Sequence, residues 1–214
     1  LRRPRPSAQP CETLSLMAAV VTVFSGHQSG LDYAKETLKE LKNFRDRGVR
    51  TVAGDEVRAI WLGTPYWTDL NFYNWLEGEL NVTVPMDMFG YYHADTLIDT
   101  SSEDSMLVGI ARNAMRNFPM TRQLLGSYEN YLDDYRMLSK NYDADFAVIP
   151  GHLGCTHGHG VSGLMREESD RMGLPLLSFE FDMLDPRVNP RDDVEVIFRN
   201  FVNDIVLPKK AARP

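Results

Sequence analysis

The stretch "DFAVIPGHLGCTHGHGVSGLMREESDRMGLPLLSFEFD", residues 145–182, decides the fold that this sequence predicts. It opens on an apolar run at residues 145–150 and closes on a second apolar run at residues 174–182. Between them, residues 160–173 have a helical pattern that ends at Gly173. A strand, a helix and a second strand in this order are typical of a crossover unit, whose two strands are parallel.

The same alternation continues on both sides of this stretch. Two more apolar runs predict strands at residues 57–63 and 81–87. Helical patterns occupy residues 68–80, 101–115, 127–142 and 190–206. The strands are continuous apolar runs, which favours a sheet covered on both faces. We therefore predict an α/β fold with a parallel, doubly wound (Rossmann- or flavodoxin-like) sheet of about four strands.

The N-terminal quarter of the chain has a different character. Residues 1–10 are basic and proline-rich, which predicts a linker. Residues 11–24 are apolar enough for a buried helix, and residues 31–48 form an amphipathic helical pattern. We expect an N-terminal linker and helical segment over 1–54 and an α/β domain over 55–214. Because the chain begins with Leu, we also expect it to be part of a longer protein.

Composition narrows the class of protein. The 214 residues carry a net charge of −7, so an acidic surface disfavours nucleic acid as a partner. No apolar run approaches 18 residues, so no membrane span is expected. The two cysteines lie far apart in sequence, which argues against a disulfide framework and for a reducing, cytoplasmic location.

Ligands of open parallel sheets bind outside the carboxyl ends of the strands. Three loops follow predicted strands and are therefore candidates for a site: residues 63–67, 85–93 and 150–160. The third has the most residues suited to catalysis or ligand binding, since "GHLGCTHGHGVSG" holds one cysteine, three histidines and five glycines.

The residues of this third loop leave three interpretations open. Gly158, Gly160 and Gly163 spell the G-x-G-x-x-G of a dinucleotide-binding turn, with Glu180 or Asp182 as the ribose acid. Cys155, His157 and His159 are instead potential metal ligands, although alternate residues of one loop rarely complete a metal site. The glycines could also serve only the conformation of the loop.

Longer stretches resemble a known family. Residues 173–205, "GLPLLSFEFDMLDPRVNPRDDVEVIFRNFVNDI", follow a pattern whose matching positions are Gly173, Pro175, Leu177, Asp182, Asp185, Pro186 and Arg187. Upstream, "VIPGHLGCTHGHGVSG" has the layout of a strand, a short loop with one cysteine, and a helix. "IWLGTPYWTDL" supplies a turn with Trp61, Gly63, Pro65 and Trp67. In their order and spacing these motifs resemble the C-terminal half of the 2-hydroxyacyl-CoA dehydratase / benzoyl-CoA reductase family, of the D-component type.

The resemblance implies an anaerobic iron–sulfur enzyme. Such subunits use about three cysteines to hold a [4Fe-4S] cluster, pair with a related second subunit as a heterodimer, and receive an electron from an ATP-dependent activator protein. The substrate would be a CoA thioester, which a lyase dehydrates by radical chemistry or a related reductase reduces. On this interpretation Cys155 is the metal ligand, and His157 and His159 are the catalytic hydrogen-bond donors.

The residues expected to bind the substrate lie in the same three loops. They are Trp67, Asp87, Tyr91, His93, Gly158 and Gly160.

The sequence also departs from the family pattern. Met88 or a neighbour stands where many members have a further cysteine, and Cys11, in the linker-like region, is not counted as a ligand. One thiolate cannot hold a cubane cluster, so the ligand set of this chain is incomplete. Two alternatives therefore remain: a nucleotide-binding (NAD or FAD) oxidoreductase domain that uses Gly158–Gly163, and a cluster-free structural partner subunit.

Overall fold

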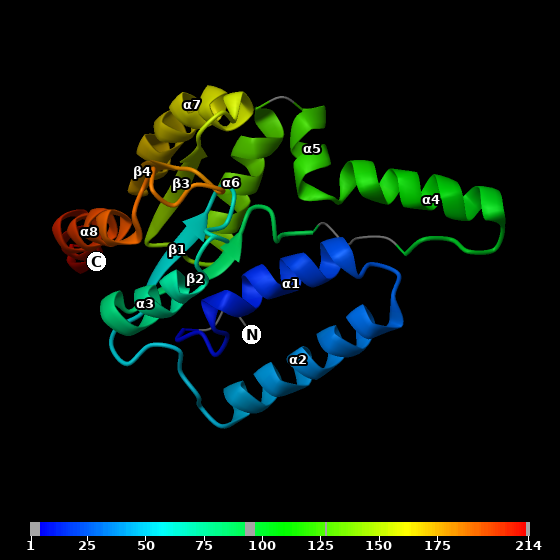
Figure 1. Cartoon of the computed structure of the whole chain (residues 1–214), viewed down its shortest axis with the longest axis horizontal. Helices are drawn as coiled ribbons and strands as arrows, with labels where there is room; N and C mark the ends of the chain where they lie inside the picture. The colour runs from blue at the N-terminus through cyan, green and yellow to red at the C-terminus, as the bar shows by residue number, and fades with distance from the viewer. Residues whose placement is uncertain (1–4, 93–96, 127, 213–214) are drawn as a thin grey trace.

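The computed structural model describes residues 5–92, 97–126 and 128–212 and has a four-stranded sheet at its centre (Figure 1). The strands lie in the order β2-β1-β3-β4, and every neighbouring pair is parallel. Their bounds are β1 Val57–Trp61, β2 Val82–Asp87, β3 Phe146–His152 and β4 Leu176–Phe181. The predicted parallel α/β fold is therefore confirmed, with each strand inside the apolar run that predicted it or within two residues of its end.

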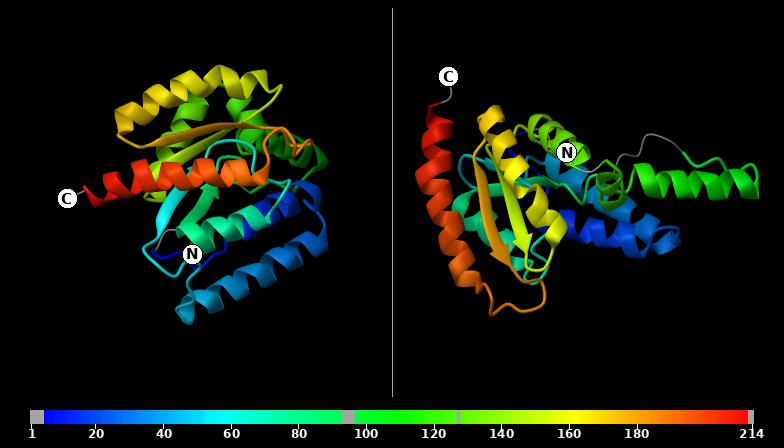
Figure 2. Two further views of the ribbon diagram at one scale, coloured as in Figure 1. Left: turned by 60° about the vertical axis from the view of Figure 1, so that its left-hand side comes forward. Right: turned by 90° about the horizontal axis from the view of Figure 1, so that it is seen from above.

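Helices cover both faces of the sheet, as Figure 2 shows. They include α3 Asn71–Leu80, α6 Glu129–Asn141, α7 Thr156–Met172 and α8 Arg191–Phe201. Helices α3 and α8 share one face, where the rings of Phe72 and Phe198 meet with centroids 5.2 Å apart. Helices α6 and α7 share the other, where the Tyr135 hydroxyl lies 2.6 Å from that of Ser169.

The chain changes direction between β1 and β3. From β1 it moves outward to the edge strand β2, then crosses back to β3 on the other side of β1. This topological switch point is where doubly wound sheets bind ligands, at the carboxyl ends of the strands. A Cβ built on Gly63, after β1, would lie 3.3 Å from Pro150 of β3, so the two strands approach closely there.

The strand sequences fit their burial. All residues of β1 and β2 are buried, as continuous apolar runs require when both faces are covered. Strand β4 alternates instead, with Ser178 and Glu180 exposed. Trp61 is fully buried at the centre of the core, and its indole N–H donates to the carbonyl of Thr64 at 2.8 Å.

Two helices precede the sheet and run side by side in Figure 1. They are α1 Cys11–Val23 and α2 Gln28–Asp46. Helix α1 contacts α3 and β2 and is only partly buried: Leu14 is in the core, whereas Leu16 is 40% and Val23 69% exposed. The predicted burial of this helix therefore holds for one side only, because α1 packs on one side.

Helix α2 also differs from its predicted packing. Its apolar stripe leaves Leu31 and Leu38 nearly half exposed, and Leu41 is its one large buried side chain. Helix α2 lies against α1 rather than against the sheet. The proposed division at residue 54 stays a prediction, although Cys11 and Leu14 of α1 belong to the same hydrophobic core as the strands.

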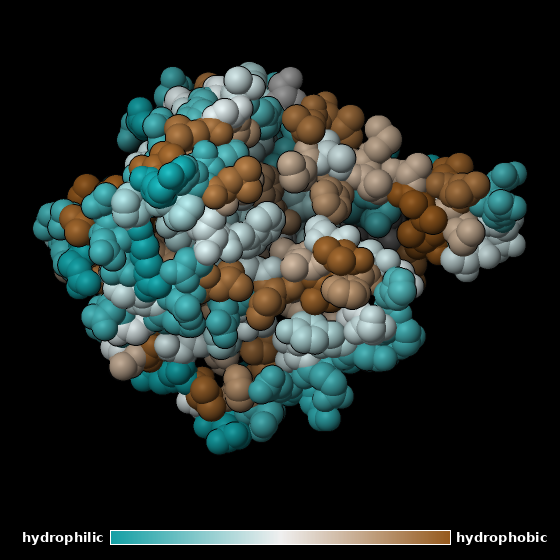
Figure 3. Space-filling model, viewed as in Figure 1, coloured by the Kyte–Doolittle hydropathy of each residue, from teal (hydrophilic) through white to brown (hydrophobic). Residues whose placement is uncertain are grey.

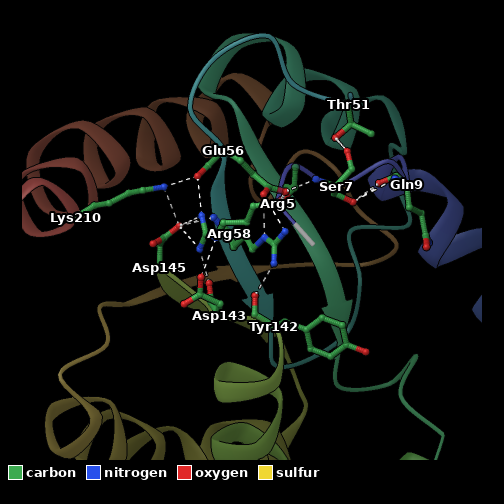
Figure 4. Close-up of polar contacts among 11 residues, drawn as sticks. Arg5, Ser7, Gln9, Thr51, Glu56, Arg58, Tyr142, Asp143, Asp145 and Lys210 are labelled. Atoms are coloured by element: carbon green, nitrogen blue, oxygen red, sulfur yellow. Dashed lines mark hydrogen bonds and ion pairs between the residues drawn. The ribbon is translucent and has the colours of Figure 1, made fainter. Parts of the chain in front are cut away.

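Residues 5–10 are packed against the sheet, whereas the sequence predicted a linker. Ser7, Ala8 and Gln9 are each at most 6% exposed. The backbone N–H of Ser7 donates to the Glu56 carboxylate at 3.0 Å, and Arg5 bonds both Asp143 and Asp145 (Figure 4). Specific polar contacts thus fix a segment whose composition suggested only a flexible one.

Figure 4 shows the ionic cluster to which Arg5 belongs, at the amino ends of β1 and β3. Arg58 is fully buried and donates to Glu56 and to the carbonyl of Tyr142, both at 3.0 Å. Lys210, near the C-terminus, reaches Asp145 at 3.2 Å. The cluster therefore joins the first described residues, the sheet and the last helix.

The remaining helices lie at the periphery. The crossover from β2 to β3 contains α4 Glu103–Arg116 and α5 Pro119–Leu125, and the chain ends on the π-helical turn η1 Val202–Val206 and on α9 Leu207–Ala211. Ser102 caps α4 with a capping box, whereas α5 was not predicted. Among the described residues, no helix has the length and apolar character needed to cross a bilayer.

Candidate functional site

The loop after β3 is much shorter than predicted. Strand β3 ends at His152 and helix α7 begins at Thr156, so only Leu153–Cys155 connect them. Gly154, with φ 84°, provides the turn. The prediction of a long loop over 150–160 was wrong because strand β3 continues to His152 and helix α7 already begins at Thr156.

The position of the glycines does not fit the dinucleotide-binding turn. In that motif the first glycine makes the turn, and the third allows close helix–strand packing. Here Gly158, Gly160 and Gly163 all lie within α7. A Cβ on Gly160 or Gly163 would meet nothing within 4 Å, so neither is needed for a close approach. The three glycines therefore do not occupy the positions of the dinucleotide-binding turn.

Cys155 is the N-terminal cap of α7. Its Sγ accepts a long hydrogen bond from the backbone N–H of Gly158, at 3.4 Å, and its side chain is half-buried. An orphan N–H at a helix start stabilises an acceptor placed there. The thiol is therefore at the carboxyl edge of the sheet, as predicted, and already has one structural role.

The two histidines of α7 point in different directions. Residues two apart on a helix do not face each other. His157 lies against Tyr131 of α6, with ring centroids 5.3 Å apart, and its buried Nε2 has no hydrogen-bond partner among the described residues. His159 is exposed on the other side, where a Cβ on Gly151 would be 2.9 Å from its ring. The structure therefore does not bring them together around one ligand.

The second cysteine lies well inside the protein. Cys11 is 2% exposed, and its Sγ accepts from the backbone N–H of Val84, in the middle of β2, at 2.9 Å. Burial, followed by the neighbouring Glu77, raises the pKa of the Cys11 thiol well above its ordinary value. A sealed, protonated thiol of this kind is not a metal ligand.

The donor set does not fit a [4Fe-4S] cluster held by this chain alone. The sequence has two cysteines, of which only Cys155 is accessible. Within the described ranges no group of three His, Cys, Asp or Glu side chains could hold a metal ion. Met88, where a further thiolate was considered, is 1% exposed and packed in the core.

Three residues at the end of β2 and directly after it were expected to bind substrate. Asp87 is 2% exposed, and its Oδ1 accepts from the backbone N–H of Gly90, so it holds the turn. Tyr91 is partly buried against the core. His93 lies outside the described residues. Asp87 thus has a structural role at this edge of the sheet.

An apolar groove of about 420 Å³ lies beside this loop. Its walls are α1, the loops that follow β1 and β2, and α5 with the residue before it. Figure 3 shows apolar side chains over these helices on the face seen in Figure 1. Trp67, which the sequence placed among the substrate-binding residues, is half exposed and lines the groove.

The polar groups of the groove are few and mostly engaged. The Thr22 hydroxyl donates to the carbonyl of Ala18 at 2.9 Å, and the Ser15 hydroxyl is hydrogen-bonded to Tyr73. Tyr92 packs edge-on against Phe118, with centroids 5.6 Å apart. Burial, and then the nearby Asp87 carboxylate, raises the pKa of Tyr92. The groove is therefore suited to apolar ligand groups.

Most of the groove was not predicted from the sequence. Leu16 and Ala19 of α1, and Phe118 and Met120 beside and within α5, line it together with Leu70. One signal was available: "CETLSLMAAVVTV" is apolar around the whole helix, so a helix that meets the sheet on one side must present apolar residues elsewhere. No comparable signal marked α5, a helix of only seven residues.

Comparison with known proteins adds one finding. The family model described as 2-hydroxyglutaryl-CoA dehydratase, D-component, matches residues 1–203. A search of curated proteins found no significant match. The matched range includes the helices α1 and α2 as well as the whole sheet.

Proposed function

Because the chain belongs to the 2-hydroxyglutaryl-CoA dehydratase D-component family, we propose that it is a CoA-thioester-binding subunit of a 2-hydroxyacyl-CoA dehydratase-type lyase or of a related reductase. The observation that carries the proposal is the apolar groove at the carboxyl ends of β1 and β2. Doubly wound sheets bind their ligands at this edge.

The size of the groove indicates which part of a CoA thioester it would hold. Its volume of about 420 Å³ is within the usual range for small-molecule sites. A complete CoA thioester is larger, so the acyl group and the adjoining end of the pantetheine arm would lie inside and the nucleotide outside. Trp67, half exposed at the rim, would cover the acyl end.

The other residues expected to bind substrate have narrower roles in this proposal. The N–H of Gly158 is already used by Cys155, whereas Gly160 is exposed near the start of α7. His157 and His159 remain candidates for donating to a substrate oxygen, from opposite sides of the helix. Asp87 would set the charge of the site rather than contact the ligand.

Cys155 is the one accessible thiolate that this chain offers to a cluster. The remaining ligands of a [4Fe-4S] cluster would have to come from outside the chain. A related second subunit and an ATP-dependent activator, implied by the family resemblance, stay part of the proposal.

The single thiolate also favours a second candidate function, a cluster-free subunit that completes the site of its partner. Iron and sulfide analysis of protein purified under anaerobic conditions, with EPR after reduction, separates the two. Stoichiometric iron with a cluster signal would support ligation through Cys155, and its loss in Cys155→Ser would confirm the ligand. Absence of iron would support the cluster-free role.

The thioester-binding proposal is tested by calorimetric titration of the 214-residue chain with butyryl-CoA. We expect saturable binding that Trp67→Ala weakens about tenfold, roughly 1.4 kcal/mol, because the substitution removes an aromatic wall. Val196→Ala is the matched control, since Val196 is an exposed apolar residue of α8, away from the groove. Equal affinity of the Trp67→Ala and parent proteins would contradict the assignment of the groove, and saturable NADH binding would revive the dinucleotide interpretation.

A further inference from the structure

We propose that the groove beside Trp67 selects uncharged hydrocarbon acyl groups, aromatic ones included, and rejects acyl groups that carry a second carboxylate. This inference rests on the proposed thioester-binding function. It separates this chain from the dicarboxylic glutaryl substrate after which its family is named.

Among the described residues, the side chains that line the groove offer no positive charge to a carboxylate. None of the described residues that line it is Lys, Arg or His. A carboxylate moved from water into such a site needs a cation or several donors to replace its hydration. The hydroxyls of Ser15 and Thr22 cannot serve readily, because both are engaged, with Tyr73 and with the α1 backbone.

One buried carboxyl group lies close to the groove. Asp87 is buried beside the groove, close enough to act on Tyr92, which lines it. Two carboxylates in a poorly solvated region repel each other, and the repulsion is weakly screened there. A second carboxylate on the acyl group would therefore meet repulsion as well as lost hydration.

The walls of the groove are largely aromatic. Trp67, Phe89, Tyr92 and Phe118 bring their rings to one groove, opposite small alanines of α1. Aromatic rings pack favourably edge-to-face or offset on other rings. A flat hydrocarbon acyl group can pack against these rings, whereas an acyl group that ends in a carboxylate cannot.

The experiment compares three probes by calorimetric titration of the full chain: 3-phenylpropionyl-CoA, glutaryl-CoA and free CoA. We expect 3-phenylpropionyl-CoA to bind at least tenfold more tightly than glutaryl-CoA, and glutaryl-CoA to bind no more tightly than free CoA. Equal or tighter binding of glutaryl-CoA would overturn the inference.

A charged variant of the groove tests the electrostatics directly. Ala19→Lys places an ammonium group at the groove on an exposed position of α1, and we expect it to reverse the preference, weakening phenylpropionyl-CoA and strengthening glutaryl-CoA at least fivefold each. Val23→Lys is the control, because Val23 lies on the same helix, is 69% exposed and does not line the groove. An unchanged preference in Ala19→Lys, or the same change in Val23→Lys, would contradict selection by this groove.

Failure of this inference can be distinguished from failure of the proposed thioester-binding function. If both thioesters bind and glutaryl-CoA is preferred, or neither is, the acyl class is wrong while the thioester-binding function stands. If neither thioester nor free CoA binds, the proposed function fails, and this inference fails with it.

Discussion

At the scale of single residues, the buried side chain of Glu77 caps the start of a neighbouring helix. It is 6% exposed in α3, and its Oε1 accepts from the backbone N–H of Cys11, the first residue of α1. Helix α1 has Pro10 as its N-terminal cap, which offers no side-chain acceptor. Glu77 therefore supplies the capping group from another element and stabilises the docking of α1.

We predict that Glu77 makes stability depend on pH. Burial raises the pKa of Glu77 from 4.5 to about 7, against weaker opposing hydrogen bonds from Cys11 and Thr51 and with a further small rise from Glu12. The folded state then binds a proton that the unfolded state has lost, so stability decreases as pH rises from about 4.5 to 7. The full effect is on the order of 3 kcal/mol.

Chemical denaturation at several pH values tests this prediction. Glu77→Gln, which keeps an oxygen acceptor for Cys11, should flatten the profile between pH 4.5 and 7 and be at least as stable as the parent at pH 8. Glu79→Gln, at an exposed position of the same helix, should leave the profile unchanged. A parent profile that rises across this interval would contradict the raised pKa.

The site residues were predicted with uneven success at this scale. Cys155 lies at the carboxyl edge as expected, because a residue directly after a parallel strand must be there. Whether His157 and His159 could act together was not decided by their spacing in a loop. Helix α7 includes both residues, so their side chains point to opposite sides of the helix. The structure was needed to show that the helix extends this far.

At the scale of elements, α7 determines what its glycines do. A glycine in an exposed helix interior costs stability relative to alanine, because its backbone loses more freedom on folding. Gly163 is such a position, since it is exposed and an added Cβ would meet nothing within 4 Å. Gly173, with φ 61°, ends the helix in the left-handed conformation instead.

We therefore predict opposite effects for two substitutions in one helix. Gly163→Ala should stabilise the protein by about 0.5–1 kcal/mol, and Gly173→Ala should destabilise it by about 1–2 kcal/mol. Thermal unfolding followed by circular dichroism measures both. If Gly163→Ala proved destabilising, the backbone at that position would need a glycine after all, and the dinucleotide interpretation would regain support.

The groove between helices α1 and α5 could not be predicted from the sequence of either helix. The apolar character of α1 was evident, but its exposed side became meaningful only where α5 and the loop after β2 lie opposite it. Helix α5 has seven residues, too few to give a clear periodic pattern. The groove is therefore a product of element packing rather than of any local motif.

At the scale of the whole molecule, the two edges of the sheet have different tasks. The carboxyl edge holds the groove and Cys155, whereas the amino edge holds the ionic cluster of Figure 4. Glu56 is central to that cluster: its carboxylate accepts from Arg58, from the N–H of Ser7 and from the hydroxyl of Thr83, at 2.9–3.0 Å. It thus ties the N-terminal segment to β1 and β2.

We predict that Glu56→Ala destabilises the protein by about 3–5 kcal/mol, because it removes a carboxylate that pairs with a fully buried arginine. Urea unfolding measures the change. Glu36→Ala is the control, since its pair with Lys39 is exposed and should contribute at most about 0.5 kcal/mol. Similar values for the two variants would show that the cluster adds nothing beyond a surface ion pair.

The sequence by itself determined the sheet: its parallel strands, its covered faces and the edge at which Cys155 and Trp67 lie. These follow from the spacing of apolar residues, which is a local property of the chain. The tertiary structure alone decided which side chains meet. Arg5 and Lys210 share Asp145 across 140 and 65 residues of sequence, and α1 faces α5 across the groove. Such contacts depend on the path of the chain through space, which no local sequence pattern specifies.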